Sequence, residues 1–242
     1  MINHLKLYSG LSVYFGRDLK TKTHAHHAME IIFAVDGNLT VHSGKNIKAH
    51  GVIIRPDTPH SVTSDGLTIS ILLFPETELC NEVSALLSGK NIVKLEAPVV
   101  GDLKKHFKNY TSKHFNEDSI CTLLSQSVGS GHARDISQNQ IDFRVTKVID
   151  LIKSSPQKSV PFARLISESG LSESRLLHLF KKETGTTIRK FALWNKLQHA
   201  IKLHLAGNNL TKAASLSGFT DAAHFNRVFV SNFGLNPSFM LK

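Results

Sequence analysis

The sequence GFTDAAHFNRVF at residues 218–229 decides the fold of the C-terminal part of this chain. A glycine turn leads to Asp221, a good helix N-cap, and then to helical spacing of the apolar residues Phe225, Val228 and Phe229. The sequence GLSESRLLHLF at residues 170–180 repeats this order earlier in the chain. A short helix, a glycine turn and a second helix with an apolar stripe are typical of a helix-turn-helix, whose second helix enters the major groove of DNA.

The two stretches belong to a longer internal repeat. Gly170 matches Gly218 at an offset of 48 residues, and Gly185 matches Gly234 at an offset of 49. The first pair fits a turn position that favours positive φ. Helical patterns predict six helices in this part of the chain, at 141–153, 161–169, 173–183, 188–205, 211–217 and 222–232. The long fourth helix joins the two copies and would let them reach successive segments of the major groove.

The positive charge is concentrated in the same part of the chain. The 242 residues carry a net charge of +10, with 15 Lys and Arg against 6 Asp and Glu over 141–242, and 14 against 13 over 1–140. A basic half beside a neutral half favours a nucleic-acid-binding module joined to a second domain, although a merely basic surface would give the same count. The hydrophobic fraction of 41% excludes a wholly disordered chain.

The stretch 163–241 resembles the DNA-binding domain of AraC/XylS-type transcription regulators. His178 and Lys196 stand where that family often has arginine. The resemblance implies sequence-specific binding of double-stranded DNA. It rests on Gly170, Leu171, Ser172, Leu176 and 180–185 in the first copy, and on Gly218, Phe219, Asp221, Phe225, Arg227, Phe229, Gly234 and Pro237 in the second.

The helix faces opposite the apolar stripes supply the candidate DNA contacts. Exposed side chains of the two recognition helices are expected to reach base edges, and lysines are expected to contact phosphates. The base-reading candidates are Ser174, Arg175, His178, Asn226 and Arg227, and the phosphate-binding candidates are Lys181, Lys182 and Lys196.

Short apolar runs between turn residues dominate the first third of the chain. They predict strands at 30–35, 39–42, 52–54 and 67–74, with hairpin turns at 36–38 and 43–45. Helical spacing then predicts helices at 76–87, 99–113 and 118–128. The polar, glycine-containing stretch 129–140 is the predicted interdomain linker.

Histidines near the start of the chain follow a spacing that resembles a cupin barrel, a domain often joined to AraC-type DNA-binding domains. The pattern consists of His24, His26, Glu30 and Gly37, followed by Gly51, Pro56 and His60. The resemblance, over roughly 11–74, implies a mixed two-domain fold. Its parts are a cupin-like β-barrel with trailing helices over 1–128, the linker, and an all-α domain with two helix-turn-helix motifs over 141–242.

Four of these side chains are candidates for an effector pocket: His24, His26, Glu30 and His60. Two histidines on one strand face, together with Glu30 and His60, would also suit one divalent metal ion. The alternative, which we retain as the expectation, is a pocket or hydrogen-bonded network without a metal or another cofactor. His27 is expected to point to the opposite face and to be exposed.

These observations predict a transcription regulator that responds to an unknown small-molecule effector and is not an enzyme. The rival interpretations are a metal-dependent cupin enzyme with a DNA-localising tail, and an effector-independent DNA binder whose barrel is filled by its own side chains. A homodimer is expected, with RNA polymerase as a further partner. The stripe of Leu103, Phe107 and Tyr110 would form the dimer seam or else pack on the barrel.

Three observations bear on the compartment. The chain has two cysteines, it has no apolar run of about 18 residues, and its first 30 residues do not form a signal peptide. We expect a cytoplasmic protein without membrane contact.

Overall fold

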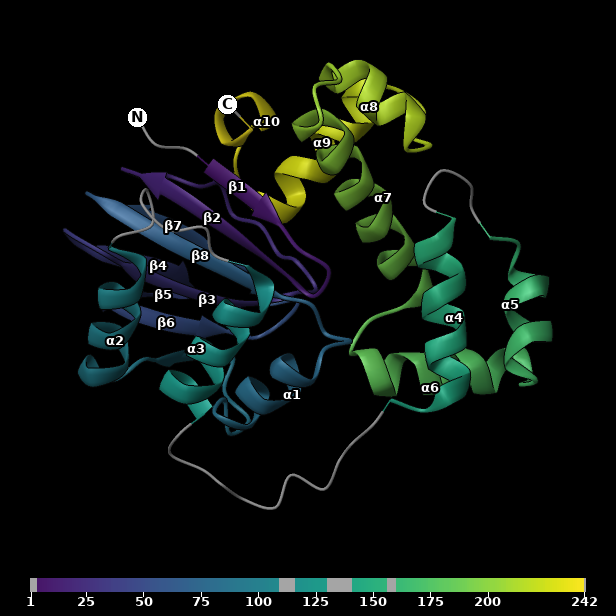
Figure 1. Cartoon of the computed structure of the whole chain (residues 1–242), viewed down its shortest axis with the longest axis horizontal. Coiled ribbons are helices and arrows are strands. Elements are labelled where there is room, and N and C mark those ends of the chain that lie inside the picture. Colours follow the sequence, from purple (N-terminus) through teal and green to yellow (C-terminus); the bar gives the residue numbers. More distant parts are fainter. Residues whose placement is uncertain (1–3, 109–115, 130–140, 156–159, 242) are drawn as a thin grey trace. The chain divides into compact units, whose positions relative to one another are not determined.

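The computed structural model describes residues 4–108, 116–129, 141–155 and 160–241 (Figure 1). Its contacts divide the chain into two compact units. The first contains Met1–Gln138 together with Val230–Lys242, and the second contains Asn139–Phe229. The expected linker lies outside the described residues, apart from Gly129. The contact division places the C-terminal segment Val230–Lys242, which the sequence grouped with the DNA-binding helices, in the first unit.

The first unit is built from two antiparallel sheets. The strands of the larger sheet lie in the order β1, β2, β8, β3, β6, β9, and those of the smaller sheet in the order β5, β4, β7. The larger sheet comprises β1 (His4–Leu7), β2 (Leu11–Arg17), β3 (Met29–Ala34), β6 (Gly51–Ile54), β8 (Leu67–Leu73) and β9 (Ile92–Lys94). The smaller sheet comprises β4 (Leu39–Ser43), β5 (Lys45–Ala49) and β7 (Ser61–Ser64).

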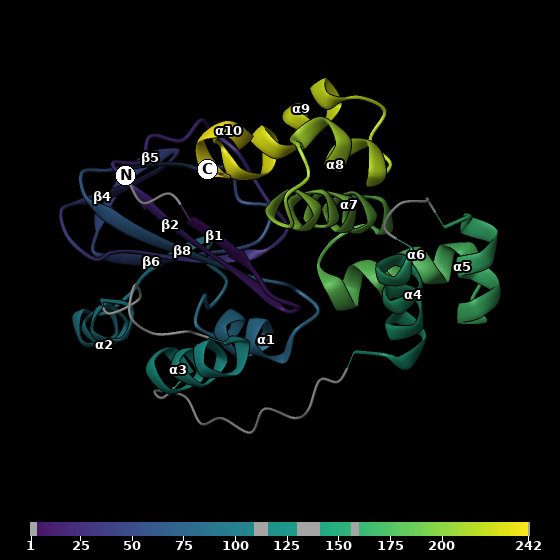
Figure 2. The ribbon, with the colours of Figure 1, turned by 45° about the horizontal axis from the view of Figure 1, so that its top comes forward.

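Both faces of the larger sheet are buried. Along β3 the side chains alternate, so that Ile31 and Phe33 join the core shared with the helices, whereas Ile32 and Ala34 join the core shared with the smaller sheet. Three helices cover the first face: α1 (Glu78–Ala85), α2 (Ala97–Phe107) and α3 (Glu117–Gly129) (Figure 2). Glu30 precedes Ile31 on β3, so this alternation directs its carboxylate into the space between the sheets.

One of the two predicted hairpin turns is confirmed and the other is wrong. Residues 43–45 join β4 to β5, which pair directly. Residues 36–38 instead carry the chain from the larger sheet to the smaller one, because β3 pairs with β6 and β8 and not with β4. Gly37 lies in this connection with φ of 70°, a conformation typical of tight turns. The turn is therefore present, although the two strands that flank it do not pair.

The apolar stripe of α2 packs on the barrel. Leu103 and Phe107 are 0% and 1% exposed and belong to the core under the larger sheet, where the Phe107 ring lies 6.1 Å from Phe15 and 5.7 Å from Phe33. Tyr110, the third residue of the candidate dimer seam, lies outside the described residues. Leu103 and Phe107 are therefore buried in the barrel core.

The second unit and the segment that follows it are helical. The first helix-turn-helix has α5 and α6 and the second has α8 and α9, with α7 between them. The helices are α4 (Phe143–Ser154), α5 (Phe162–Ser169), α6 (Glu173–Thr184), α7 (Ile188–Leu205), α8 (Leu210–Leu216), α9 (Ala222–Phe233) and α10 (Pro237–Met240). The six helices predicted from the sequence are confirmed within two residues at each end, and α10 was not predicted.

The repeat is visible in the backbone as well as in the sequence. Four matched glycines lie in the left-handed region, with φ of 65° at Gly170, 77° at Gly218, 71° at Gly185 and 66° at Gly234. Asp221 caps its helix by accepting a hydrogen bond from the His224 N–H at 2.6 Å. Each copy therefore ends its helices with a turn that glycine adopts without steric cost.

Each copy also has an apolar centre. In the first, the Phe180 ring lies 5.6 Å from that of Phe191 at the start of α7. In the second, the Phe225 ring contacts Phe219 edge to face and Phe229 at a tilt, with ring centroids 5.4 and 5.8 Å apart. Through these contacts, the buried faces of the recognition helices α6 and α9 pack in the core of their copy.

The left-handed conformation of Gly170 gives a prediction that is independent of packing. A Cβ at this position would meet no atom within 4 Å, so a substitution acts only through the backbone. Gly170→Ala should lower the free energy of unfolding by about 1–2 kcal/mol, and Gly170→Asn by less, because asparagine tolerates this region. Urea unfolding of the full chain measures both, and alanine that is no worse than asparagine would contradict the assignment.

Candidate DNA-binding surface and buried histidine cluster

The first recognition helix, α6, presents its predicted DNA-contacting residues to solvent. Ser174, Arg175 and His178 are exposed and line one hollow, while Leu176 and Phe180 are fully buried on the opposite face. Lys181 and Lys182 are also exposed, in the last turn of the helix. The side chains predicted to contact bases and phosphates are thus free of the core.

The second recognition helix, α9, likewise has one buried and one exposed face. Asn226 and Arg227 are exposed between Phe225 and Val228, which are buried. Lys196, the third predicted phosphate contact, is half-buried on α7, and its Nζ donates to the carbonyl of Gly218 at 3.5 Å. Its side chain therefore lies beside the turn of the second helix-turn-helix, and its contact with phosphate stays a prediction.

Helix α7 sets the separation between the two copies. It contains 18 residues, so it is about 27 Å long at 1.5 Å per residue. Successive major-groove segments on one side of B-DNA repeat about every 34 Å. A connector of this length is compatible with two recognition helices that bind neighbouring turns of the major groove.

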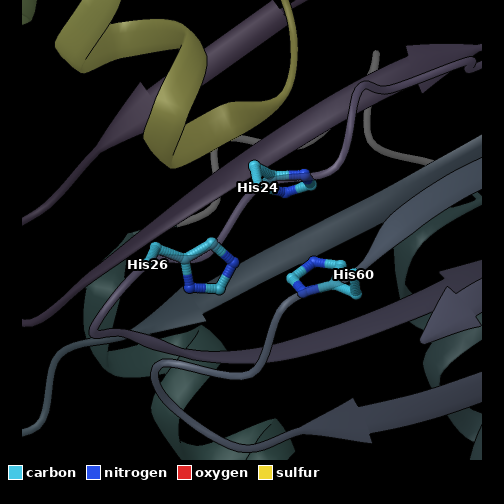
Figure 3. A group of neighbouring side chains, drawn as sticks. All are labelled: His24, His26 and His60. Atoms are coloured by element: carbon cyan, nitrogen blue, oxygen red, sulfur yellow. The ribbon is translucent and has the colours of Figure 1, made fainter. Parts of the chain in front are cut away.

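The histidines of the first unit gather inside the barrel. His24, His26 and His60 turn their rings toward a common space, with ring centroids 4.3 Å apart for His24 and His60 and 5.4 Å apart for His26 and His60 (Figure 3). His24 and His60 also pair through their backbones, since each N–H donates to the other's carbonyl at 2.9 and 3.0 Å. One ligand nitrogen from each of the three rings lies within 4.8 Å of the others.

Glu30 faces this cluster from β3. Its Oε1 accepts a hydrogen bond from the Ser70 hydroxyl on β8 at 2.6 Å. Its Oε2 lies 3.0 Å from Nε2 of His60 and 3.4 Å from Nε2 of His26. All four sequence-predicted pocket residues are therefore brought together, and each is at most 8% exposed.

The Nδ1 atoms of the three histidines point away from the cluster, and their contacts determine which ring nitrogen carries the hydrogen. Nδ1 of each histidine lies against a backbone carbonyl two residues away, at 2.9 Å from Lys22 for His24, 2.8 Å from Ala28 for His26 and 2.8 Å from Thr58 for His60. A carbonyl only accepts, so each Nδ1 carries the hydrogen. In the neutral rings Nε2 is then a lone-pair acceptor, and for His26 and His60 it faces an oxygen that is also an acceptor.

The electrostatics of the cluster favour a charged Glu30. Burial opposes ionisation of this carboxyl group, but His26 and His60 outweigh it and hold its pKa well below the usual range. Burial lowers the pKa of His60, yet Glu30 more than compensates and raises it. Burial, with the charges of His60 and His26, lowers the pKa of His24 to about 3, so this ring is neutral at pH 7. The carboxylate thus requires a proton or a cation between itself and the imidazoles.

The cluster lines a very small cavity. Its volume is about 30 Å³, close to the volume of one water molecule in the liquid. Organic ligands occupy pockets of about 300–1,000 Å³. The walls come from the barrel and from the C-terminal segment of the same unit, which contributes Asn232, Phe233, Leu235 and Met240.

Two features of this site differ from the sequence analysis. His27 is 4% exposed and not on the surface, because 27–28 form a bend and the strand-like alternation fails there. Ser70 was missed as the partner of Glu30. The available signal was a polar residue between the apolar Ile69 and Ile71 of β8, at an inward-facing position that it shares with Thr68.

The Ser70–Glu30 hydrogen bond can be tested against a neighbour on the same strand face. Ser70→Ala should lower the free energy of unfolding by about 1.5–3 kcal/mol, since it removes a hydrogen bond to a buried charged group. The Thr68 hydroxyl is fully buried and has no hydrogen-bond partner in the described part of the chain. Thr68→Val should therefore be neutral or stabilising. Equal effects of the two substitutions in urea unfolding would contradict this account of Glu30.

Comparisons with known proteins agree with both parts of the fold. A family model described as a helix-turn-helix domain matches residues 165–242. The uncharacterized HTH-type transcriptional regulator YidL of Escherichia coli (strain K12) is 26% identical over 219 residues, covering 85% of this chain and 72% of that protein. The transcriptional activator NphR of Rhodococcus sp is 28% identical over 127 residues, which are 52% of this chain and 37% of that protein.

Solved structures give the same result for the whole chain. The crystal structure of an apo ToxT variant from Vibrio cholerae has a TM-score of 0.66 and 16% sequence identity, and the match covers 97% of this chain and 99% of that one. This similarity supports a two-domain fold with a β-rich N-terminal part and a helical C-terminal part. The duplicated helix-turn-helix, the family match over 165–242 and the regulator relatives support the resemblance of this chain to transcription regulators of the AraC/XylS family.

Proposed function

We propose that this chain binds specific sites on double-stranded DNA through α6 and α9 and that its barrel controls this binding. The observation that carries the proposal is the repeated arrangement of two recognition helices, each with a buried apolar face and an exposed polar face. Ser174, Arg175, His178, Asn226 and Arg227 would read base edges. Lys181 and Lys182 would bind phosphates, and the net charge of +9 over 141–242 would attract the duplex.

The small cavity limits what the barrel would sense. ToxT has been solved with an unsaturated fatty acid bound. A ligand of that size would need a much larger space than the 30 Å³ beside Glu30. A small effector that fits this polar space without rearrangement of the core is favoured over a long-chain or aromatic one. Its effect requires different affinities for two states of the chain.

The same cavity argues against the enzyme interpretation. A metal-dependent cupin enzyme needs room for both an ion and an organic substrate, and about 30 Å³ does not hold both. The relatives are also named as regulators. We therefore propose a regulator without enzymatic activity.

We propose action in the cytoplasm, as a homodimer and in contact with RNA polymerase. Leu103 and Phe107 are committed to the barrel core, so a dimer would use another surface. Among the helices that the structure describes, none is long and apolar enough to cross a membrane.

Arg227 provides the sharpest test of the DNA-binding surface. Arg227→Ala should weaken operator binding by about 1–3 kcal/mol if the guanidinium reads a base, with a matching loss of preference at that base pair. Lys105→Ala is the matched control, because it removes one positive charge from an exposed position on α2 of the barrel. Gel-shift titrations of the two full-length variants on operator and on unrelated DNA provide the measurement.

The control defines the outcomes. Lys105→Ala should bind both DNAs as the wild type does. Wild-type operator affinity in Arg227→Ala, or equal losses in both variants, would show that α9 does not read DNA in the proposed way.

A further inference from the structure

We infer that helix α7 is a DNA-binding surface in its own right, and that Arg189 and Lys196 on it bind the phosphate backbone between the two major-groove segments. The inference rests on the proposed function and deepens it, because it names the part of the duplex that lies over the surface between α6 and α9. The sequence patterns predict α7 as a connector between the copies and do not single out Arg189.

A hollow of about 480 Å³ lies along α7 within the second unit. Leu177 of α6, which is 43% exposed, and His224 of α9 both line it, so the hollow extends from one recognition helix to the other. Each of these side chains adjoins the exposed face of its helix, since Leu177 precedes the exposed His178 and His224 follows the exposed Ala223. The hollow therefore lies beside both faces that are proposed to read DNA.

The position of this hollow matches one part of a bound duplex. On one side of B-DNA, successive major-groove segments are separated by the minor groove, which is about 6 Å wide and bordered by the two phosphate backbones. A chain that inserts α6 and α9 into successive segments therefore turns the surface between them, which includes α7, toward these backbones. Duplex DNA carries about one negative charge per 1.7 Å of its axis, so a surface in that place needs positive charge.

The side chains around the hollow supply that charge. Arg189 and Lys196 both line it, and among the lining residues that the structure describes none is Asp or Glu. The two cations lie on the same side of α7, about 10 Å apart along the helix axis, with Ala192 and Leu193 between them. Lys196 already donates to the carbonyl of Gly218, but an ammonium group carries three N–H donors, so this contact is compatible with a phosphate contact.

The first turn of α7 gives a separate argument. It contains Arg189 and Lys190 but no acidic residue, although the partial positive charge of a helix N-terminus favours acidic side chains there. Two cations in this turn oppose the helix dipole, and the exposed Arg189 packs in no core that would require it. A phosphate beside Arg189 would offset this repulsion, because an anion at a helix N-terminus interacts favourably with both the dipole and the guanidinium group.

The test compares Arg189→Gln with a matched control, Lys202→Gln, in the full chain. Lys202 is an exposed cation on the same helix, but it projects about 140° away from Arg189 around the axis and does not line the hollow. Binding is titrated with salt on an operator selected from random duplexes and on unrelated DNA. Arg189→Gln should weaken binding to both DNAs by a similar factor, because a phosphate contact carries no sequence information.

The salt dependence and the site of contact are the decisive readouts. The log–log salt slope of Arg189→Gln should be smaller by about 0.9, so that its affinity deficit shrinks about 3.5-fold between roughly 50 and 200 mM salt. Lys202→Gln should keep the wild-type slope. In ethylation interference, modified phosphates that border the minor groove between the two major-groove segments should block binding of the wild type, and Arg189→Gln should remove the block at one of them.

The outcomes separate this inference from the proposed function. Arg189 is exposed, so its variant is expected to fold, and it decides the test even if Lys196→Gln, which also loses the contact with Gly218, does not fold. An Arg189→Gln variant with the wild-type slope and interference pattern, or with a loss confined to the operator, would overturn the phosphate contact and leave the proposed function intact. A wild-type chain without salt-dependent DNA binding would overturn the proposed function, and the inference with it.

Discussion

The interior of the barrel depends on the burial of one carboxylate. Glu30 points inward because β3 is buried on both faces and its side chains must alternate between two cores. An ionised carboxylate in that position is stable only with hydrogen bonds and a nearby positive charge. Ser70 donates the hydrogen bond. The Nε2 atoms of His26 and His60 lie close enough to the carboxylate to hold a proton or a cation beside it.

The same stretch is where the barrel meets the C-terminal segment. The boundary between the compact units falls inside α9, so one helix carries exposed DNA-reading candidates in its first turns and barrel contacts in its last. A change in the histidine cluster has a short covalent and hydrogen-bonded route to that helix, through Lys22 and Gly234. Allosteric coupling needs two distinct sites and a difference in affinity between two states.

The parts of the structure that could be predicted are those encoded by local sequence. Helix-turn-helix order, the positive φ of Gly170 and Gly218, and the exposed face of Arg227 all follow from residues within one or two turns. The grouping of His24, His26, Glu30 and His60 followed from motif spacing. Strand partners could not be predicted, since β2 pairs with β8 more than 50 residues away. The burial of His27 and the seating of Val230–Lys242 on the barrel also depend on such distant contacts, and neither has a local signal.

The central claim is that the two helix-turn-helix copies bind DNA together, with α6 and α9 in successive segments of the major groove. The most direct measurement is a hydroxyl-radical footprint of the full chain on its operator. The account predicts two protected segments on one side of the duplex, about one helical turn or 34 Å apart. Protection of one segment alone, by a chain that binds the operator specifically, would contradict the account.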